Sequence, residues 1–215
     1  MGPGPQTERM EMATSEQGTR VARRYDRIAW LYDFVTERRL FSKLRSQLLR
    51  GVEGDVLEVG VGTGNNFPYY PQGVRLAAID ISPKMLARAV EKAHQLGMEA
   101  DLRVMNVEEM SFPDRSFDYV VSSLVFCSVE NPLQGLREVA RVMKENGELR
   151  MLEHVRSEQP LLGRIMDLLN PLARLIGDNI NRRTLASLEA AGFEIISVQS
   201  KGPGVLKEIR ASVHK

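Results

Sequence analysis

The amino-acid sequence predicts one α/β domain with a doubly wound, mostly parallel sheet and helices on both of its faces. Three observations lead to this expectation. Short apolar stretches alternate with amphipathic stretches from residue 55 onward, a glycine-rich turn follows the first apolar stretch, and two further apolar stretches close the chain. The 215 residues are 43% hydrophobic, which is enough for one full-sized core, and neither an internal repeat nor a second domain is visible.

The N-terminal part differs in composition from the rest of the chain. Pro, Gly, Gln, Thr and Ser dominate residues 1–18, which we interpret as a disordered leader, so that the domain itself spans 19–215. Residues 19–50 are predicted to be helical. With nine basic against three acidic residues, they form the one strongly basic segment of the sequence.

The middle of the chain is predicted to supply parallel strands and their crossover helices. We expect strands at 55–59, 74–79, 102–106, 119–126 and 148–155. Ser82 is placed to cap a helix that starts at Pro83. A second amphipathic helix is predicted at 133–144, closed by Asn146 and Gly147. Because strands alternate with helices, the connections are expected to be right-handed.

The C-terminal part breaks this alternation. Residues 160–181 are predicted to form an inserted helical cap, interrupted at Pro171, and a further helix is expected at 182–191. Strands at 193–200 and 205–213 are joined by a short Gly-Pro-Gly turn and therefore form a hairpin. The predicted sheet thus has seven strands and ends with an antiparallel strand.

Composition excludes several classes of protein. The formal net charge of +1 gives no overall field that would attract nucleic acid. No apolar run approaches the roughly 18 to 20 residues of a membrane span, and the N-terminus lacks the apolar core of a secretory signal. The single cysteine, Cys127, excludes an intrachain disulfide, suits the cytoplasm, and is better explained as a packing residue than as a nucleophile. His94, His154 and His214 do not have metal-ligand spacing.

A glycine-rich turn, Gly60, Gly62 and Gly64, follows the first predicted strand. Glycine lets the backbone turn tightly and approach a ligand, and open α/β sheets bind ligands at the carboxyl ends of their strands. Asp80 ends the second strand, where its carboxylate can accept hydrogen bonds from two ribose hydroxyls. Asn106 ends the third strand, where its amide can pair with adenine. The alternatives are a ligand-free turn, a helix-capping acid and a turn-forming asparagine.

Four sequence motifs together resemble the class I S-adenosylmethionine-dependent methyltransferases. They are EVGVGTG at 58–64, AIDISPKML at 78–86, NVEEMSFPDRSFD at 106–118, and the terminal helix with its hairpin. The glycine spacing is G-x-G-x-G, whereas nucleotide-dependent dehydrogenases have G-x-G-x-x-G, which disfavours that alternative. The resemblance implies a Rossmann-like sheet and S-adenosylmethionine as the cofactor.

The resemblance also implies a role for each part of the predicted site. The glycine turn passes under the methionine and ribose parts of the cofactor, and Asp80 holds the ribose. Ile81 and Met85 flank the adenine, whose edge is read by Asn106, where many relatives have Asp, and by Val107. Residues at the ends of the first and fourth strands approach the methionine end. The implied cofactor-binding residues are Glu58, Gly60, Gly62, Thr63, Gly64, Asp80, Ile81, Met85, Asn106, Val107, Ser123 and Leu124.

The predicted catalytic residues lie at the same edge and in the N-terminal segment. Glu153 and His154 end the fifth strand, where His154 can accept a proton, although a hydrogen-bonded strand-end histidine is the alternative. YDRIAWLYD at 25–33 resembles the lid of ubiquinone/menaquinone-biosynthesis and bacterial phospholipid N-methyltransferases. Residues 19–50 are therefore expected to be a lid, with Tyr25 and Tyr32 near the cofactor and Tyr25 also near the acceptor. Ordinary helix packing of these two tyrosines is the alternative.

Two further motifs, LVFCSVEN at 124–131 and MLEHVR at 151–156, resemble animal thiol S-methyltransferases. These resemblances imply a lipophilic acceptor, and the headgroup amine of phosphatidylethanolamine is the first hypothesis. The alternative acceptors are a quinone-like molecule, a thiol or another small molecule, methylated on carbon, oxygen or sulfur. A non-catalytic S-adenosylmethionine-binding module is the alternative of another class.

The expected partners follow from the same residues. The basic lid and the Arg-flanked stretch 161–183 are suited to peripheral contact with the inner, anionic face of a membrane, and a buried cap with solvated arginines is the alternative. No N-P-P-Y-type tetrapeptide follows the fourth strand, which disfavours a nucleic-acid substrate. The chain is expected to be a monomer or a homodimer.

Overall fold

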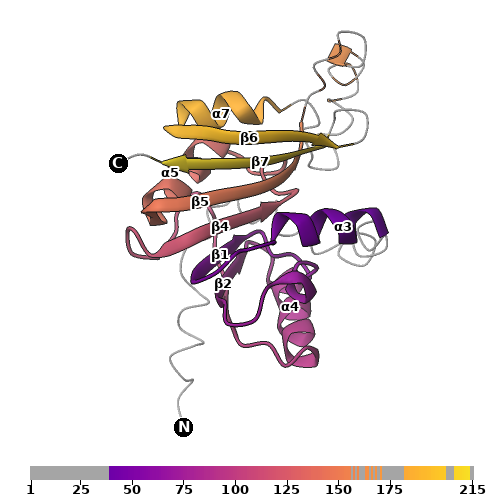
Figure 1. The fold of residues 1–215 in the computed structure, drawn as a ribbon, viewed down its shortest axis with the longest axis vertical. Coiled ribbons are helices and arrows are strands. Elements are labelled where there is room, and N and C mark those ends of the chain that lie inside the picture. Colours follow the sequence, from indigo (N-terminus) through magenta and orange to yellow (C-terminus); the bar gives the residue numbers. More distant parts are fainter. Residues whose placement is uncertain are drawn as a thin grey trace.

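In the computed structural model, one mixed sheet forms the centre of the molecule (Figure 1). The structure describes residues 39–155, 182–201 and 206–213, together with 157, 159, 163, 164, 166, 168 and 170. The described strands lie in the order β3-β2-β1-β4-β5-β7-β6, and β7 is antiparallel to both of its neighbours. The strands are β1 Asp55–Val59, β2 Arg75–Asp80, β3 Ala100–Val104, β4 Phe117–Ser123, β5 Met143–His154, β6 Phe193–Lys201 and β7 Leu206–Val213. The predicted doubly wound sheet with an antiparallel C-terminal strand is therefore confirmed.

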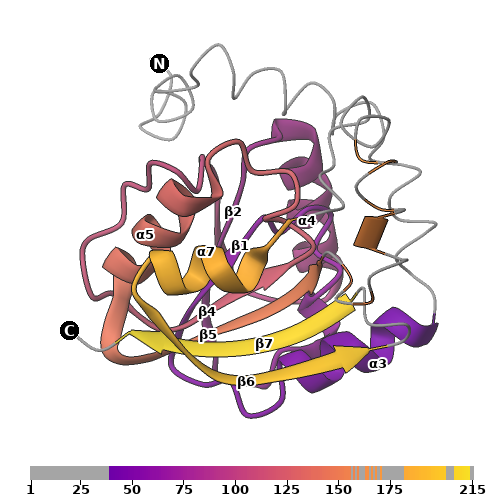
Figure 2. The ribbon, with the colours of Figure 1, turned by 90° about the horizontal axis from the view of Figure 1, so that it is seen from above.

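Helices cover both faces of this sheet. Figure 2 shows α5 and α7 on one side of the twisted sheet and α3 and α4 on the other. Since the strand order reverses between β1 and β4, the carboxyl ends of these two strands border the position where such sheets bind ligands. The described helices are α3 Arg39–Leu48, α4 Pro83–Gln95, α5 Pro132–Val142 and α7 Thr184–Ala190.

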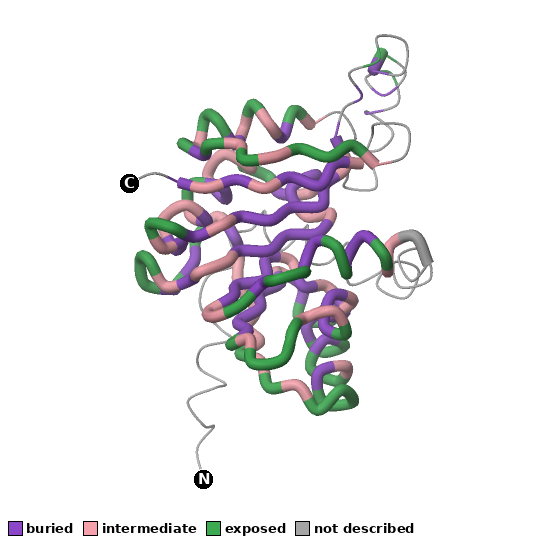
Figure 3. Tube along the Cα trace, viewed as in Figure 1, coloured by how far each residue is buried: buried purple, intermediate pink, exposed green. Residues whose placement is uncertain are grey.

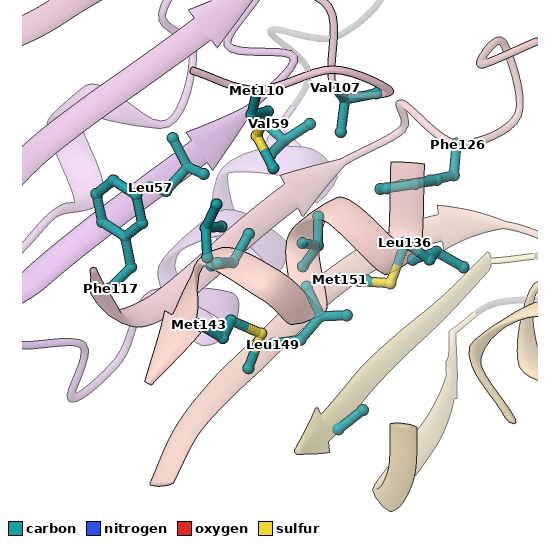
Figure 4. Packing of buried hydrophobic residues seen from close by; sticks show 14 of the residues in the cluster. Leu57, Val59, Val107, Met110, Phe117, Phe126, Leu136, Met143, Leu149 and Met151 are labelled. Carbon is teal, nitrogen blue, oxygen red and sulfur yellow. The ribbon is translucent and has the colours of Figure 1, made fainter. Parts of the chain in front are cut away.

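The core is divided between the two faces. On the α5 side, Leu136 packs with Met143, Leu149 and Met151 (Figure 4), and each of these side chains is at most 1% exposed. Burying a leucine side chain of this kind contributes about 2 to 3 kcal/mol. The central strands are buried, whereas the edge strand β6 is largely exposed (Figure 3). The site at the carboxyl edge therefore rests on a rigid base.

Local sequence signals account for the helix starts. The Ser82 hydroxyl accepts a hydrogen bond from the backbone N–H of Met85, and Pro83 occupies the first turn of α4, as predicted. Asn131 caps α5 in the same way, by accepting from the N–H of Gln134. These caps satisfy helix N–H groups that would otherwise lack a partner.

Several predicted boundaries are wrong. β3 ends at Val104, so Asn106 follows this strand and does not end it. β4 ends at Ser123 rather than at residue 126, because Leu124 adopts a left-handed backbone conformation with φ of 60° that leaves the strand. The helix predicted at 133–144 ends at Val142, and Asn146-Gly147 lies within β5 instead of closing the helix. The ammonium of Lys144 lies 2.8 Å from the Asp118 carboxylate, which ties the start of β5 to β4. Only a single 3-10 turn, Phe67–Tyr69, connects β1 to β2 among the described elements.

Several predicted segments fall outside the described residues. They are the leader 1–18, the lid up to residue 38 with Tyr25 and Tyr32, most of the inserted cap 160–181, and the turn 202–204. Residues 163, 164, 166, 168 and 170 are helical, and the predicted cap as a whole stays a prediction. Within the described residues, none of the helices has the length and apolar character needed to cross a membrane.

Candidate cofactor and acceptor site

The glycine turn after β1 approaches its surroundings closely on one side and borders open space on the other. Gly60 has φ of 65°, and a Cβ there would lie 2.4 Å from the Cγ2 of Val125. Gly62 has φ of 58°, but a Cβ there would meet no atom within 4 Å. Left-handed backbone is accessible to glycine and strained for other residues. Glycine is therefore favoured in this turn by its left-handed backbone, and Gly62 borders a space that no atom of the described chain fills within 4 Å.

Asp80 fixes this turn to the end of β2. Its Oδ2 accepts a hydrogen bond from the N–H of Gly62 at 2.8 Å, and its Oδ1 accepts one from the N–H of Ser82, also at 2.8 Å. A carboxylate has about four lone-pair sites, so it can accept more than two hydrogen bonds. Asp80 thus holds the turn and the start of α4 together at the edge where the ribose is predicted to bind.

A buried polar network lies beneath the same turn. The amide of Asn66, which is fully buried, donates to Glu58 Oε1 at 2.8 Å and to Ser123 Oγ at 3.1 Å. The guanidinium of Arg45 donates to Asn66 Oδ1 at 2.8 Å, and the Tyr70 hydroxyl donates to Glu58 Oε2 at 2.9 Å. The network joins α3, β1, β4 and the link between β1 and β2, so it fixes the floor of the site from several elements.

Burial changes the acid–base properties of this network. Burial raises the pKa of Glu58 to about 7, and the hydrogen bonds from Tyr70 and Asn66 and the charge of Arg45 offset only part of that effect. Burial also raises the pKa of the Tyr70 hydroxyl well above its usual value, and the neighbouring Glu58 adds to the shift. A cation placed near Glu58 would favour its ionised form.

The loop after β4 forms the second wall of the site. Leu124 is one of the non-glycine residues with positive φ, and its N–H donates to the carbonyl of Leu152 at 2.7 Å. Such strained backbone often occurs at functional sites. The fully buried Glu153 accepts hydrogen bonds at Oε1 from the Ser122 hydroxyl and from the N–H groups of Val125 and Phe126. Glu153 therefore holds this loop in place.

The remaining predicted residues lie around the same edge. His154 is half-buried at the end of β5 and is paired in register with Leu206. Asn106 accepts a hydrogen bond at Oδ1 from the N–H of Glu108 at 3.0 Å, which is the turn-forming role considered as its alternative. Val107 and Met85 are buried side chains. Contact of these residues with adenine stays a prediction.

Cys127 is a buried free thiol, as expected for a packing residue. In the part of the chain that the structure describes, no group of three or more His, Cys, Asp and Glu side chains could hold a metal ion. The described site is thus built from carboxylates, amides, hydroxyls and backbone N–H groups.

The structure brings together at one edge the predicted residues of the glycine turn, Asp80, Glu58, Ser123, Leu124, Glu153 and His154. Sequence reasoning missed three members of the buried network: Arg45, Asn66 and Tyr70. One signal was present. Arg45 is spaced four residues from both Phe41 and Leu49, so it lies on the apolar face of a helix, where an arginine needs a buried partner.

These residues fit S-adenosylmethionine. The space beside Gly62 admits a ligand against the backbone, the Asp80 carboxylate is of a kind that accepts hydrogen bonds from hydroxyl groups, and the acidic Glu58 suits a positively charged methionine end. Fold and site together define a Rossmann-like α/β protein with a nucleoside-binding edge.

Comparison with known proteins gives the family. Residues 57–151 match the family model described as a methyltransferase domain. A phosphatidylethanolamine N-methyltransferase from Cereibacter sphaeroides is 43% identical over 111 residues, which are 50% of this chain and 55% of that protein. A thiol S-methyltransferase from Homo sapiens is 36% identical over 171 residues, which are 76% of this chain and 69% of that protein. The chain belongs to the class I S-adenosylmethionine-dependent methyltransferases, and S-adenosylmethionine is its cofactor.

The fold has similar solved structures. The cyclase SpnF superposes with a TM-score of 0.75 at 19% identity, covering 92% of this chain and 97% of that chain. Curated ubiquinone/menaquinone biosynthesis C-methyltransferases also match, at lower identity than the two relatives above. The family resemblances expected from the sequence are therefore confirmed. The names of these relatives indicate three kinds of methylation, at nitrogen, at a thiol sulfur and at carbon.

Proposed function

We propose that this enzyme transfers a methyl group to the primary amine of the phosphatidylethanolamine headgroup. The observation that carries the proposal is the 43% identity with a phosphatidylethanolamine N-methyltransferase over 111 residues. The match covers about half of each protein. The identity over this half is what supports a common acceptor.

The geometry supports the following arrangement for the cofactor. The glycine turn, Thr63 included, lies under the methionine and ribose parts, with Asp80 accepting hydrogen bonds from the ribose hydroxyls. Glu58 attracts the methionine ammonium, directly or through water, because its buried carboxyl gains from a nearby cation. Residues after β2, β3 and β4 complete the enclosure: Ile81, Met85, Asn106, Val107, Ser123 and Leu124.

S-adenosylmethionine held by the glycine turn, Asp80 and Glu58 would supply a methyl group on a positively charged sulfur. That sulfur would keep the electron pair of the C–S bond when the methyl carbon bonds to the amine nitrogen. The protein then has to align the amine with that methyl group and exclude water. It also has to accept the proton that the methylated amine releases. We propose that His154, at the end of β5, accepts this proton. Glu153 positions the loop after β4. Tyr25 and Tyr32 lie outside the described residues and stay the proposed lid residues.

Access to a lipid requires contact with a membrane surface. In the described part of the basic segment, Lys43 of α3 and Arg50, two residues after the end of α3, are exposed, so this segment presents cationic side chains to solvent. Cationic side chains near an anionic bilayer contribute roughly 1 kcal/mol each to its binding. We therefore propose peripheral contact through this segment, which brings the carboxyl edge of the sheet close to the headgroups.

The test measures release of S-adenosylhomocysteine by the full-length protein with separate acceptors. Vesicles containing phosphatidylethanolamine are compared with phosphatidylcholine vesicles, which lack an amine that can be methylated, and with a sample without acceptor. Turnover that requires phosphatidylethanolamine and falls in the His154→Gln variant is expected. Turnover on phosphatidylcholine vesicles equal to that on phosphatidylethanolamine would contradict the proposal.

Thiol S-methylation is the second candidate, because the human thiol S-methyltransferase is 36% identical over 76% of this chain. A small alkyl thiol and a demethylated quinone extend the same assay. Turnover with the thiol alone would replace the lipid proposal, and turnover with the quinone alone would indicate carbon or oxygen methylation. A protein that binds the cofactor but methylates none of these acceptors would require a further acceptor screen.

A further inference from the structure

A hollow of about 320 Å³ lies on the sheet face that α3 covers, away from the residues predicted to bind the cofactor. It is formed where the end of α3 meets the middle of β5, β7 and β6. None of its lining residues belongs to the predicted cofactor or catalytic set. They are Gln47, Leu48, Arg50, Arg150, Gln199, Glu208 and Arg210.

The hollow is cationic. Arg50, Arg150 and Arg210 line it together with one carboxylate, that of Glu208. The Glu208 carboxylate lies 3.2 Å from the ammonium of Lys201, which offsets its charge. The Glu148 carboxylate also contacts Arg150 and Arg210. The three arginines and Lys201 together with Glu148 and Glu208 therefore have a net charge of +2.

Two of these arginines are placed against each other by the sheet. Arg150 and Arg210 are directly opposite in the register of β5 and β7. Like charges at opposite positions are destabilising, and one carboxylate, that of Glu148, bridges both guanidinium groups. A second anion at this position would stabilise the pair further.

The arginines differ in how freely they can contact a ligand. Arg150 is 7% exposed, and its guanidinium donates to the carbonyls of Leu48 and Arg50, so it fixes the end of α3. Arg210 is 43% exposed and uses Nε and one terminal nitrogen to contact Glu148. Arg50 is exposed at the rim. The wall is therefore rigid, while two guanidinium groups face solvent and the amides of Gln47 and Gln199 offer further donors.

We propose that this hollow binds the phosphate group of a small phosphate ester, free in solution or as a lipid headgroup. Guanidinium groups match phosphate oxygens with paired N–H donors, and such charge-assisted hydrogen bonds are stronger than neutral ones. A volume of about 320 Å³ lies at the lower end of the range of small-molecule sites, so it suits a small ligand. The hollow contains none of the residues proposed to bind the cofactor or to transfer the methyl group, and it shares Arg50 with the segment proposed to contact the membrane.

Binding is tested on the full-length protein by calorimetry with glycerol 3-phosphate and by co-sedimentation with phosphatidylglycerol vesicles, with phosphatidylcholine vesicles as the neutral reference. The variant is Arg50→Gln, which removes an exposed charge at the rim. The matched control is Arg137→Gln, an exposed arginine of α5 on the opposite face. Unfolding midpoints of both variants show that the fold is retained.

Arg50→Gln is expected to weaken binding by about tenfold or more, while Arg137→Gln leaves it unchanged. Binding of glycerol 3-phosphate with this variant pattern supports a soluble phosphate ester as the ligand. Binding confined to phosphatidylglycerol vesicles supports a lipid headgroup in the hollow if Arg50→Gln weakens it more than Lys43→Gln, which removes a charge of the same basic segment outside the hollow. Equal effects of these two variants reflect the general membrane contact and overturn the proposal. Absence of binding to both probes, or equal effects of Arg50→Gln and Arg137→Gln, overturns the proposal.

Discussion

Replacing Glu58 with glutamine should make the protein more stable at alkaline pH and change it little at acidic pH. Glu58 is 2% exposed and accepts hydrogen bonds from Asn66 and Tyr70. A glutamine retains both contacts, because its oxygen accepts from Asn66 and its amide nitrogen donates to the Tyr70 oxygen. The substitution therefore removes the ionisable group while keeping the buried polar network.

The size of the effect follows from the pKa of Glu58. This pKa rises from 4.5 to about 7 on folding, and each pKa unit corresponds to about 1.4 kcal/mol. Because the folded protein holds this proton more tightly than the unfolded chain, the free energy of unfolding falls as the pH rises from 4.5 to 7. Ionisation of Glu58 thus costs about 3 kcal/mol above pH 7, a cost that Glu58→Gln avoids.

The assay is urea unfolding followed by circular dichroism at pH 5 and pH 8.5, without cofactor. The stability gain of Glu58→Gln should be larger at pH 8.5 than at pH 5 by about 2 to 3 kcal/mol. Glu109→Gln, at an exposed position, serves as the control and should stay within about 0.5 kcal/mol of the parent protein. An equal gain for Glu58→Gln at both pH values would refute the assignment of a buried, proton-binding carboxyl.

Three other substitutions test the site. Gly60→Ala should lower the free energy of unfolding by about 1 to 3 kcal/mol, because the new Cβ would lie 2.4 Å from Val125 and φ at this residue is 65°. Adding Val125→Ala should restore only the part of this loss that comes from the clash with Val125. Asn66→Ala should cost about 3 kcal/mol in urea unfolding by removing the partner of the buried Arg45; a loss below 1 kcal/mol would argue against a coupled network. Asp80→Ala should weaken cofactor binding by about 1.5 to 3 kcal/mol in calorimetry, and unchanged affinity in the folded variant would overturn the ribose assignment.

The sequence predicted most of the fold because its signals are local. The strand at 55–59 and the capped helix from Pro83 were predicted to within a few residues, since apolar spacing and capping act over short distances along the chain. The end of β4 was not predicted, because the apolar run in the sequence continues past Ser123. In the structure, Leu124 adopts a left-handed backbone conformation that ends the strand. The start of β5 was missed because Asn146-Gly147 lies in an irregularity within the strand. Met143 pairs with Phe117 and Glu148 with Tyr119, so the residues between Met143 and Glu148 bulge out of the ladder.

The sequence by itself determined the class of fold, the cofactor edge and the family, because glycine spacing and strand-end acids carry that information within short motifs. Only the tertiary structure decided what lies beneath that edge. Arg45 and Asn66 are 21 residues apart, and Asn66 and Ser123 are 57 apart, yet they form one hydrogen-bonded network around Glu58. The raised pKa of Glu58 arises from burial by the whole fold, and the arginine-lined hollow arises from the register of β5 and β7. Burial and cross-strand register depend on how distant segments pack, so no local pattern in the sequence specifies them.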